Sequence, residues 1–287
     1  MSERNFLFIV NPFSGKSKVD IKLLINKNLD STIKAVIKET EYPKQAITIA
    51  KENHENFDAV IAVGGDGTVN EVAQGLLNSQ TPMGIIPTGS GNGLARELNY
   101  SMDLKTNIRQ LHTLKSRKMN IAFWNKELFL CAAGVGFDGL IAHKFAKNKT
   151  RGLATYIKLI FSTYWNFKTF NVTVNDCEYP KTFICSVLNS GQYGNDFKLS
   201  PKKSLFNDQL ELVIIKKPNI FQAPLLLFYA YYSDVNKLSF VQRISGKHFE
   251  IKANNQYHHL DGEVQEKSDK AFGNISFKSN YFQVLTR

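Results

Sequence analysis

The stretch Val63-Gly64-Gly65-Asp66-Gly67-Thr68-Val69-Asn70-Glu71 places three glycines around one carboxylate. It follows an apolar, β-branched run at residues 59–63, typical of a buried strand, and apolar residues recur at helical spacing from 68 to 78. Glycines let the chain turn sharply from a strand into a helix and bring backbone N–H groups close to an anion. We therefore predict a strand, a phosphate-binding loop and a helix in succession.

The same alternation of β-rich runs and helical patterns extends through the first 120 residues. Strands are expected at 5–10, 33–37, 59–63 and 83–87, the pattern of a parallel sheet with flanking helices. Beyond residue 120, short aromatic and β-branched runs predict a mainly antiparallel β-sandwich, interrupted by helices at 155–166 and 221–234. We therefore predict an α/β N-terminal domain, 1–120, and a β-sandwich C-terminal domain, 121–287.

Three glycine-containing loops follow predicted strands of the first domain. They are Asn11-Pro12-Phe13-Ser14-Gly15-Lys16, Gly64-Gly65-Asp66-Gly67-Thr68 and Thr88-Gly89-Ser90-Gly91-Asn92-Gly93. The carboxyl ends of parallel strands share one edge of the sheet, where ligands bind, so we expect the loops to converge on phosphate. Neither common nucleotide motif fits, because a Walker A loop needs glycine at Val10 and a dinucleotide loop needs it at Leu94.

Acidic residues in two places suggest phosphoryl transfer. Asp66 would repel a bound phosphate unless it binds a metal ion or handles a proton. The run Leu260-Asp261-Gly262-Glu263 is by itself an ordinary hairpin turn, although an enzyme with a second domain facing the nucleotide needs carboxylates there. His258 and His259 beside it are interpreted as surface residues rather than ligands.

The composition of the chain restricts the partners and the cellular location that we expect for the protein. The chain has 36 Lys and Arg against 25 Asp and Glu, a formal net charge of +11, which favours anionic partners without choosing among nucleotides, nucleic acid and acidic membranes. Three cysteines without CxxC spacing suggest neither a disulfide framework nor a zinc cluster. The apolar runs at 6–10 and 223–232 are too short for a signal peptide or a membrane span. We expect a cytoplasmic protein.

In order and spacing, the three loops resemble those of the diacylglycerol kinase catalytic-domain family, which includes bacterial lipid kinases, sphingosine kinases and ceramide kinases. Further matches at Gly134-Val135-Gly136-Phe137-Asp138, Arg151-Gly152, residues 194–201 and 260–263 extend the resemblance nearly end to end. It implies an NAD-kinase-like nucleotide-binding domain, a β-sandwich lipid-substrate domain, and an ATP and Mg²⁺ site in the cleft between them. The implied ATP contacts are Asn11, Pro12, Ser14, Gly15, Thr40, Gly64, Gly65, Gly67, Thr68, Asn70 and Ser90.

The resemblance leaves two candidates for the proton acceptor. One is Glu263 with Asp261, and the other, as in sphingosine-kinase-like members, is Asp66. The chain departs from the family at Phe206-Asn207-Asp208-Gln209-Leu210, where bacterial relatives have an Asp-Gly that helps to hold a structural Mg²⁺. Because one carboxylate is lost there, the case for this metal weakens, and Asp208 remains the candidate ligand.

A lipid kinase also needs an apolar groove for acyl chains. The candidate groove residues are Tyr156, Leu159, Ile160, Thr163 and Phe167 on one predicted helix, and Phe221, Leu225, Phe228 and Tyr232 on another. An ordinary core explains these stripes equally well. The nearby cations Lys144, Lys147, Lys149, Arg151 and Lys158 suggest electrostatic docking on anionic head groups.

The sequence therefore predicts an ATP-dependent lipid kinase that phosphorylates a hydroxyl of a diacylglycerol-like or sphingoid-like lipid, in phospholipid biosynthesis or related lipid metabolism. We expect transient peripheral contact with a membrane, a homodimer, and no nucleic-acid partner. One alternative is an NAD kinase-like enzyme, which shares the Gly-Gly-Asp-Gly loop but not the third loop. Another is a non-catalytic nucleotide-binding module, suggested only by the altered turn at Asn207-Asp208.

Overall fold

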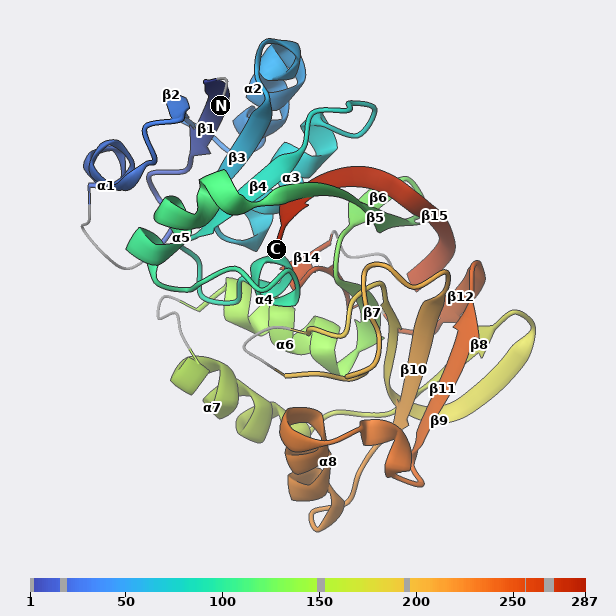
Figure 1. Ribbon diagram of the computed structural model, residues 1–287. Helices are drawn as coiled ribbons and strands as arrows, with labels where there is room; N and C mark the ends of the chain where they lie inside the picture. Colours follow the sequence, from blue (N-terminus) through green and yellow to red (C-terminus); the bar gives the residue numbers. More distant parts are fainter. Residues whose placement is uncertain (1–2, 16–19, 149–152, 194–196, 256, 266–270) are drawn as a thin grey trace. The chain divides into compact units, whose positions relative to one another are not determined.

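The computed structural model describes residues 3–15, 20–148, 153–193, 197–255, 257–265 and 271–287 (Figure 1). The chain divides into two compact units, unit 1 of Met1–Met119 with Asn280–Arg287 and unit 2 of Asn120–Ser279. The predicted second domain, 121–287, wrongly included the last eight residues. They belong to unit 1 because the long strand β15 (Ala271–Thr286) ends in parallel pairing with β4 (Met83–Pro87), Val284 opposite Met83.

Unit 1 is built on the predicted parallel sheet. Its strands lie in the order β2 (Ile33–Glu39), β1 (Arg4–Val10), β3 (Ala59–Gly64), β4 and the end of β15, with every pair parallel. All of β3 and the last five residues of β1 are buried, because helices cover both faces of the sheet. The parallel α/β architecture predicted for the first domain is confirmed.

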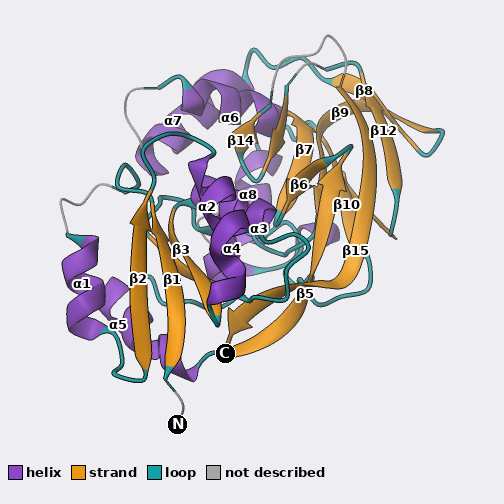
Figure 2. Ribbon diagram, turned by 90° about the horizontal axis from the view of Figure 1, so that it is seen from above, coloured by secondary structure: helices purple, strands orange, loops and turns teal. Residues whose placement is uncertain are grey.

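The helices of unit 1 form two layers (Figure 2). In one layer α1 (Ile21–Asn28) packs with α5 (Leu104–Gln110), and in the other α2 (Gln45–Asn53) packs with α3 (Asp66–Gly75). The short helix α4 (Gly93–Glu97) follows β4. On α3 the predicted apolar face is buried, with Val69, Val72 and Ala73 turned inward. α3 begins two residues after the last residue of β3, whereas α4 begins after the loop 88–92 that follows β4.

Unit 2 is rich in antiparallel strands. At its centre β9 (Cys177–Leu188) pairs with β7 (Ala132–Gly136), β8 (Phe170–Val174) and β10 (Leu210–Lys216). The remaining strands are β5 (Lys115–Trp124), β6 (Glu127–Phe129), β11 (Val241–Gly246), β12 (Phe249–Ala253), β13 (His258–Leu260), β14 (Glu263–Val264) and the first part of β15. The predicted change from parallel to antiparallel strands is confirmed.

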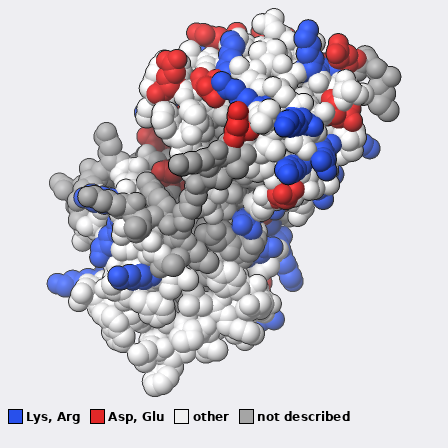
Figure 3. All heavy atoms as spheres, turned by 90° about the vertical axis from the view of Figure 1, so that its left-hand side faces the viewer, with Lys and Arg blue, Asp and Glu red and all other residues white. Residues whose placement is uncertain are grey.

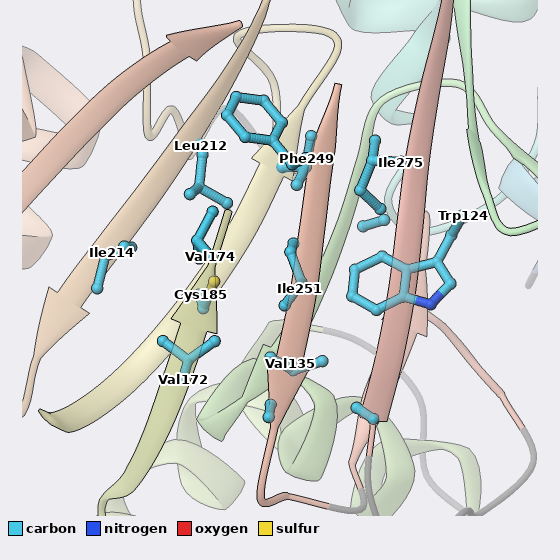
Figure 4. Close-up of a cluster of buried hydrophobic side chains, with 14 of the residues drawn as sticks. Trp124, Val135, Val172, Val174, Cys185, Leu212, Ile214, Phe249, Ile251 and Ile275 are labelled. Atoms are coloured by element: carbon cyan, nitrogen blue, oxygen red, sulfur yellow. The ribbon is translucent and has the colours of Figure 1, made fainter. Parts of the chain in front are cut away.

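Three helices accompany these strands: α6 (Phe137–Ala146), α7 (Leu153–Tyr164) and α8 (Gln222–Tyr232). The sequence predicted helices at the positions of α7 and α8 but not α6. The core of the unit contains Trp124, Val135, Ile251 and Ile275, whose side chains converge in Figure 4. Among the described residues, none of the helices has the length and apolarity needed to cross a bilayer.

Candidate active site

The three glycine loops of unit 1 lie side by side because they leave three adjacent strands. The Asn11 N–H donates to the Val63 carbonyl at 3.0 Å, which joins the first loop to the end of β3. The Thr88 N–H donates to the Gly64 carbonyl at 2.9 Å, which joins the third loop to the same strand from the other side. The Gly64–Thr68 loop is therefore the middle member of the group.

Side chains fasten the first loop to its neighbours. The Asn11 amide nitrogen donates to the Thr68 hydroxyl at 3.0 Å, while its amide oxygen accepts from the Phe13 N–H at 3.0 Å. The Thr88 hydroxyl donates to the Ser14 hydroxyl at 2.8 Å. Two of the predicted contact residues, Asn11 and Ser14, thus hold the loops in register and leave amide and hydroxyl groups at this edge.

Gly65 and Gly89 allow the second and third loops to touch. A Cβ added at Gly89 would lie 2.6 Å from the Gly65 Cα, and one added at Gly65 would lie 3.3 Å from the Gly89 Cα. The sequence explained these glycines by the approach of backbone to an anion. The structure shows a second reason, which is that only glycine lets the two backbones pack against each other.

The Asp66 carboxylate connects the second loop to the third. It belongs to the first turn of α3, and its two oxygens accept from the Asn92 N–H at 2.8 Å and the Gly93 N–H at 2.7 Å. Hydrogen bonds between a carboxylate and backbone N–H groups are stronger than neutral ones. Asp66 therefore holds the second and third loops together, a structural role that the sequence did not indicate and that adds to the predicted metal or proton chemistry.

The other predicted residues of unit 1 occupy the same edge. Thr40 directly follows β2, is buried, and donates its N–H to the Val10 carbonyl at 2.9 Å. Asn70 lies one turn into α3, where its side-chain oxygen accepts from Gln74 at 2.7 Å. Pro12 and Ser90 are exposed, whereas Gly67 is half-buried in the first turn of α3. Lys16, in the first loop, lies outside the described residues.

Asn92 is a site residue that the sequence prediction omitted. Its backbone is left-handed, its side-chain nitrogen donates to the Gly89 carbonyl at 2.8 Å, and its buried side-chain oxygen has no hydrogen-bond partner among the described residues. The available signal was its place between Gly91 and Gly93, because Asn tolerates a left-handed turn.

This edge has the chemistry of a phosphate site. Its groups are backbone amides, the Ser14 and Thr88 hydroxyls and the amino terminus of α3, all of which suit phosphate oxygens. Over the described ranges, no three His, Cys, Asp or Glu side chains gather as metal ligands. Mg²⁺ bound with a nucleotide needs only one or two carboxylates beside the phosphates, so Asp66 fits such an ion.

The two carboxylates of the acidic turn in unit 2, Asp261 and Glu263, lie in different environments. Asp261 has a left-handed backbone, and its carboxylate accepts from three consecutive N–H groups, those of Leu130, Cys131 and Ala132, at 2.8, 2.7 and 3.1 Å. Glu263 lies two residues further on in β14 and is exposed. Asp261 therefore anchors the turn, and Glu263 is the carboxylate presented at the surface of the unit.

A buried polar network lies directly beneath this turn. The Asp138 carboxylate, on α6, accepts from the Ser186 hydroxyl at 2.7 Å, from the Tyr193 hydroxyl, and from the His259 Nε2 at 3.1 Å. The other ring nitrogen of His259 accepts from the Gly262 N–H at 3.2 Å. His259 thus links α6 to the turn, and the interpretation of this histidine as a surface residue was wrong because the residue is only 3% exposed.

The environment keeps Asp138 ionised. Burial alone would raise the pKa of this carboxyl, but the His259 ring and hydrogen bonds from His259, Ser186 and Tyr193 outweigh burial and hold the pKa below its usual value. A buried carboxylate that is ionised must keep its hydrogen-bond donors, so this network fixes the position of the acidic turn.

The turn at Asn207-Asp208 has no described cluster of ligands. The Asn207 side-chain oxygen accepts from the Ser204 N–H, which leaves this side chain as a local cap. Asp208 is exposed, and no group of three metal-ligating side chains in the described part of the chain contains it. Asp208 as a metal ligand stays a prediction.

For the described candidates on α7, the alternative of an ordinary core is the correct one. Leu159 and Ile160 pack against the core of unit 2, Phe167 belongs to that core, and Thr163 is buried and accepts from Lys144 at 2.9 Å. The side chain of Tyr156 lies outside the described residues, as do Lys149 and Arg151. On α8, by contrast, the predicted face is exposed: Phe221, Leu225, Phe228 and Tyr232.

The chain thus combines a parallel α/β unit that carries converging glycine loops with an antiparallel unit that carries an acidic turn. The sequence profile of the diacylglycerol kinase catalytic domain matches residues 5–124. A diacylglycerol kinase of Bacillus subtilis is 30% identical over 230 residues, which cover 74% of each chain. The chain therefore belongs to the diacylglycerol kinase family.

Other relatives match part of the sequence, and a solved structure matches the fold. A candidate lipid kinase of Streptococcus pneumoniae is 32% identical over 175 residues, which cover 58% of this chain and 60% of that one. The match to an uncharacterised protein of Synechocystis covers only 34% of that longer relative. A solved structure of a candidate diacylglycerol kinase from Bacillus anthracis superposes with a TM-score of 0.81 at 21% identity, covering 99% of this chain and 96% of that one.

Proposed function

We propose that this protein is an ATP-dependent lipid kinase that transfers the γ-phosphate to a hydroxyl of a diacylglycerol-like or sphingoid-like lipid. The observation that carries the proposal is the group of three loops joined by Asp66, which presents amide and hydroxyl groups at one strand edge. Membership in the diacylglycerol kinase family supports a lipid as the acceptor.

In the proposed nucleotide site, unit 1 orients the phosphates. Backbone amides of the glycine loops and the amino terminus of α3 contact phosphate oxygens, and Asn11 and Ser14 keep the loops in place. Mg²⁺, when bound beside Asp66, neutralises charge on the phosphates. Both Asp66 oxygens already accept backbone N–H bonds, so we assign this residue to holding the third loop and to the metal ion.

We assign proton transfer to Glu263 in unit 2. In the reaction the lipid hydroxyl oxygen forms a bond to the γ-phosphorus, the bond from that phosphorus to the leaving ADP oxygen breaks, and the hydroxyl proton moves to the carboxylate. Glu263 is exposed, while the Asp261 oxygens are engaged by three backbone N–H groups. Asp261 and the Asp138–His259 network act as positioning residues for this turn.

The test is to incubate the protein with γ-labelled ATP and a total lipid extract and to identify the labelled product. We expect label in a phosphorylated lipid, with turnover reduced at least about 100-fold in Glu263→Gln, the usual contribution of a proton acceptor. Label in NADP after NAD is supplied would instead favour the NAD kinase-like alternative. Nucleotide binding without transfer to any acceptor would favour the non-catalytic alternative.

A further inference from the structure

The largest group of exposed apolar side chains lies on α7, α8 and the segments beside them. Among the described residues, sixteen large apolar side chains are exposed, and ten of them fall within residues 157–165 and 220–232. The ten are Ile157, Phe161, Trp165, Ile220, Phe221, Leu225, Leu227, Phe228, Tyr231 and Tyr232. We call this group the aromatic face. Exposed apolar side chains that are grouped in this way indicate an interaction surface, whereas single exposed apolar residues do not.

Helical spacing gathers these side chains on two stripes. Ile157, Phe161 and Trp165 recur every four residues, opposite the face of α7 that packs on the core. On α8, Leu226 and Ala230 are buried, and Phe228 and Tyr232 face outward with ring centroids 5.4 Å apart. Burial of one side of each helix therefore fixes the other side at the surface.

Contacts within unit 2 join the end of α7 to the segment that leads into α8, so the two stripes are neighbours at that point. The Tyr164 hydroxyl at the end of α7 donates to the Pro218 carbonyl just before α8. Lys217 donates to the Phe167 carbonyl at 2.8 Å and lies 5.0 Å above the Tyr164 ring. All of these contacts are within unit 2.

The two segments that contain the aromatic face carry only positive formal charges, and Asp234 lies just beyond the end of α8. No Asp or Glu occurs in residues 139–175 or 212–233, although these segments contain Lys144, Lys147, Lys158, Lys168 and Lys216, all of them exposed. In Figure 3 the α8 end of unit 2, at the bottom of the view, is almost entirely uncharged. The exposed lysines beside this mostly uncharged face favour an anionic partner, whereas a second copy of the chain would bring its own lysines to the same surface.

We propose that the aromatic face inserts into the interface of an anionic lipid bilayer. Trp and Tyr favour this depth because the ring is apolar and one end is polar, and lysines at the margin meet anionic head groups. The proposal rests on the proposed function in that a lipid kinase must reach its substrate in a bilayer. It names the docking surface, which the proposed function leaves open.

The two tryptophans provide a direct probe. Trp165 is 65% exposed on the aromatic face, whereas Trp124 is 3% exposed in the core. Vesicles of phosphatidylcholine with phosphatidylglycerol should shift the fluorescence of Trp165 to shorter wavelength, and brominated lipids should quench it. Vesicles of phosphatidylcholine alone should give a weaker effect, and salt should reduce binding to the anionic vesicles.

Variants test whether both helices contribute. Phe221→Ser with Tyr232→Ser removes two exposed rings of α8 and leaves the probe on α7, and it should lower partitioning to vesicles about tenfold or more for each ring withdrawn. The matched control is Phe272→Ser with Tyr42→Ser, which removes an exposed Phe and Tyr elsewhere and should bind as the wild type does.

Three results would overturn the proposal: sedimentation with vesicles without quenching of Trp165, equal binding of the α8 variant and the control, or aggregation through this face without lipid. An activity assay with a short-chain lipid in solution distinguishes failure of the docking proposal from failure of the proposed function. Kinase activity on that substrate without Trp165 insertion refutes only the docking surface, whereas insertion without activity on any lipid refutes only the enzyme assignment.

Discussion

Replacing Asp138 by Asn would test whether the buried network holds the acidic turn of unit 2. Oδ2 of Asp138 accepts from Ser186, Tyr193 and His259, and Oδ1 accepts from the Gly139 N–H. An amide has one acceptor oxygen and one donor nitrogen, so in either orientation its NH₂ group faces donors where the carboxylate had an acceptor. The variant therefore leaves at least one buried donor without a partner.

The expected loss in the free energy of unfolding is about 1–3 kcal/mol, the range for leaving one buried hydrogen-bond donor without an acceptor. Water cannot easily replace the lost contacts, because Ser186 and His259 are 0% and 3% exposed. In a protein unit of this size, 1 kcal/mol shifts the unfolding temperature by roughly 2–4 °C. The unfolding temperature of unit 2 should therefore fall by about 2–12 °C.

This loss should depend on pH in a definite direction. Burial opposes ionisation, but the surroundings of Asp138 hold its pKa below the usual value, so the ionised carboxylate stabilises the folded protein. That stability is fully present above the unfolded pKa of ~3.9 and disappears as pH falls through the lower pKa of the folded protein. The difference between wild type and variant should be constant from about pH 5 to 7 and shrink below about pH 4.

Differential scanning calorimetry across this pH range measures the effect. Asp176→Asn is the matched control, because Asp176 is an exposed aspartate in a turn of the same unit and should unfold as the wild type does. Equal unfolding temperatures for Asp138→Asn and the wild type at neutral pH would refute the reasoning. So would a difference that grows in acid.

Further predictions concern the loops and the acidic turn. Gly89→Ala places a methyl group 2.6 Å from the Gly65 Cα, so the second and third loops must separate, and we expect the KM for ATP in steady-state kinetics to rise about tenfold or more. Unchanged ATP kinetics would show that the loops need not touch. Asp261→Ala removes the acceptor of three N–H groups and should lower the free energy of unfolding by about 1–3 kcal/mol in denaturant titrations. Glu263→Gln should leave this quantity unchanged while reducing turnover, and the reverse pattern would exchange the roles of the two carboxylates.

Local patterns in the sequence were sufficient for much of the fold. The apolar runs of β1 and β3 identify strands buried on both faces, and their alternation with helices requires a parallel sheet. The glycine loops could be placed together because the carboxyl ends of parallel strands share one edge. Helix α6 was missed, although the Gly134–Asp138 motif that leads into it was noted.

Contacts between distant residues were beyond the sequence. His259 is buried because Asp138, 121 residues earlier in the chain, accepts its hydrogen bond. The structural role of Asp66 depends on the backbone N–H groups of Asn92 and Gly93, which belong to another loop. The structural role of Asp261 depends on backbone N–H groups 129–131 residues away. No periodicity or motif encodes these pairings, since the partners meet only when the strands align.

The buried and exposed sides of α7 and α8 show the same difference between what the sequence determines and what the tertiary structure determines. Both helices are apolar around most of their circumference, so the sequence determined that they are helices with much apolar surface but could not determine which side would be buried. Packing within unit 2 decided this, burying Leu226, partly burying Leu159, and leaving Trp165 and Tyr232 exposed. The sequence by itself therefore determined the strands, the helices and the loop chemistry, because these depend on neighbouring residues. Only the tertiary structure decided which carboxylates hold the fold and which apolar side chains face outward, because those outcomes depend on what each side chain meets across the chain.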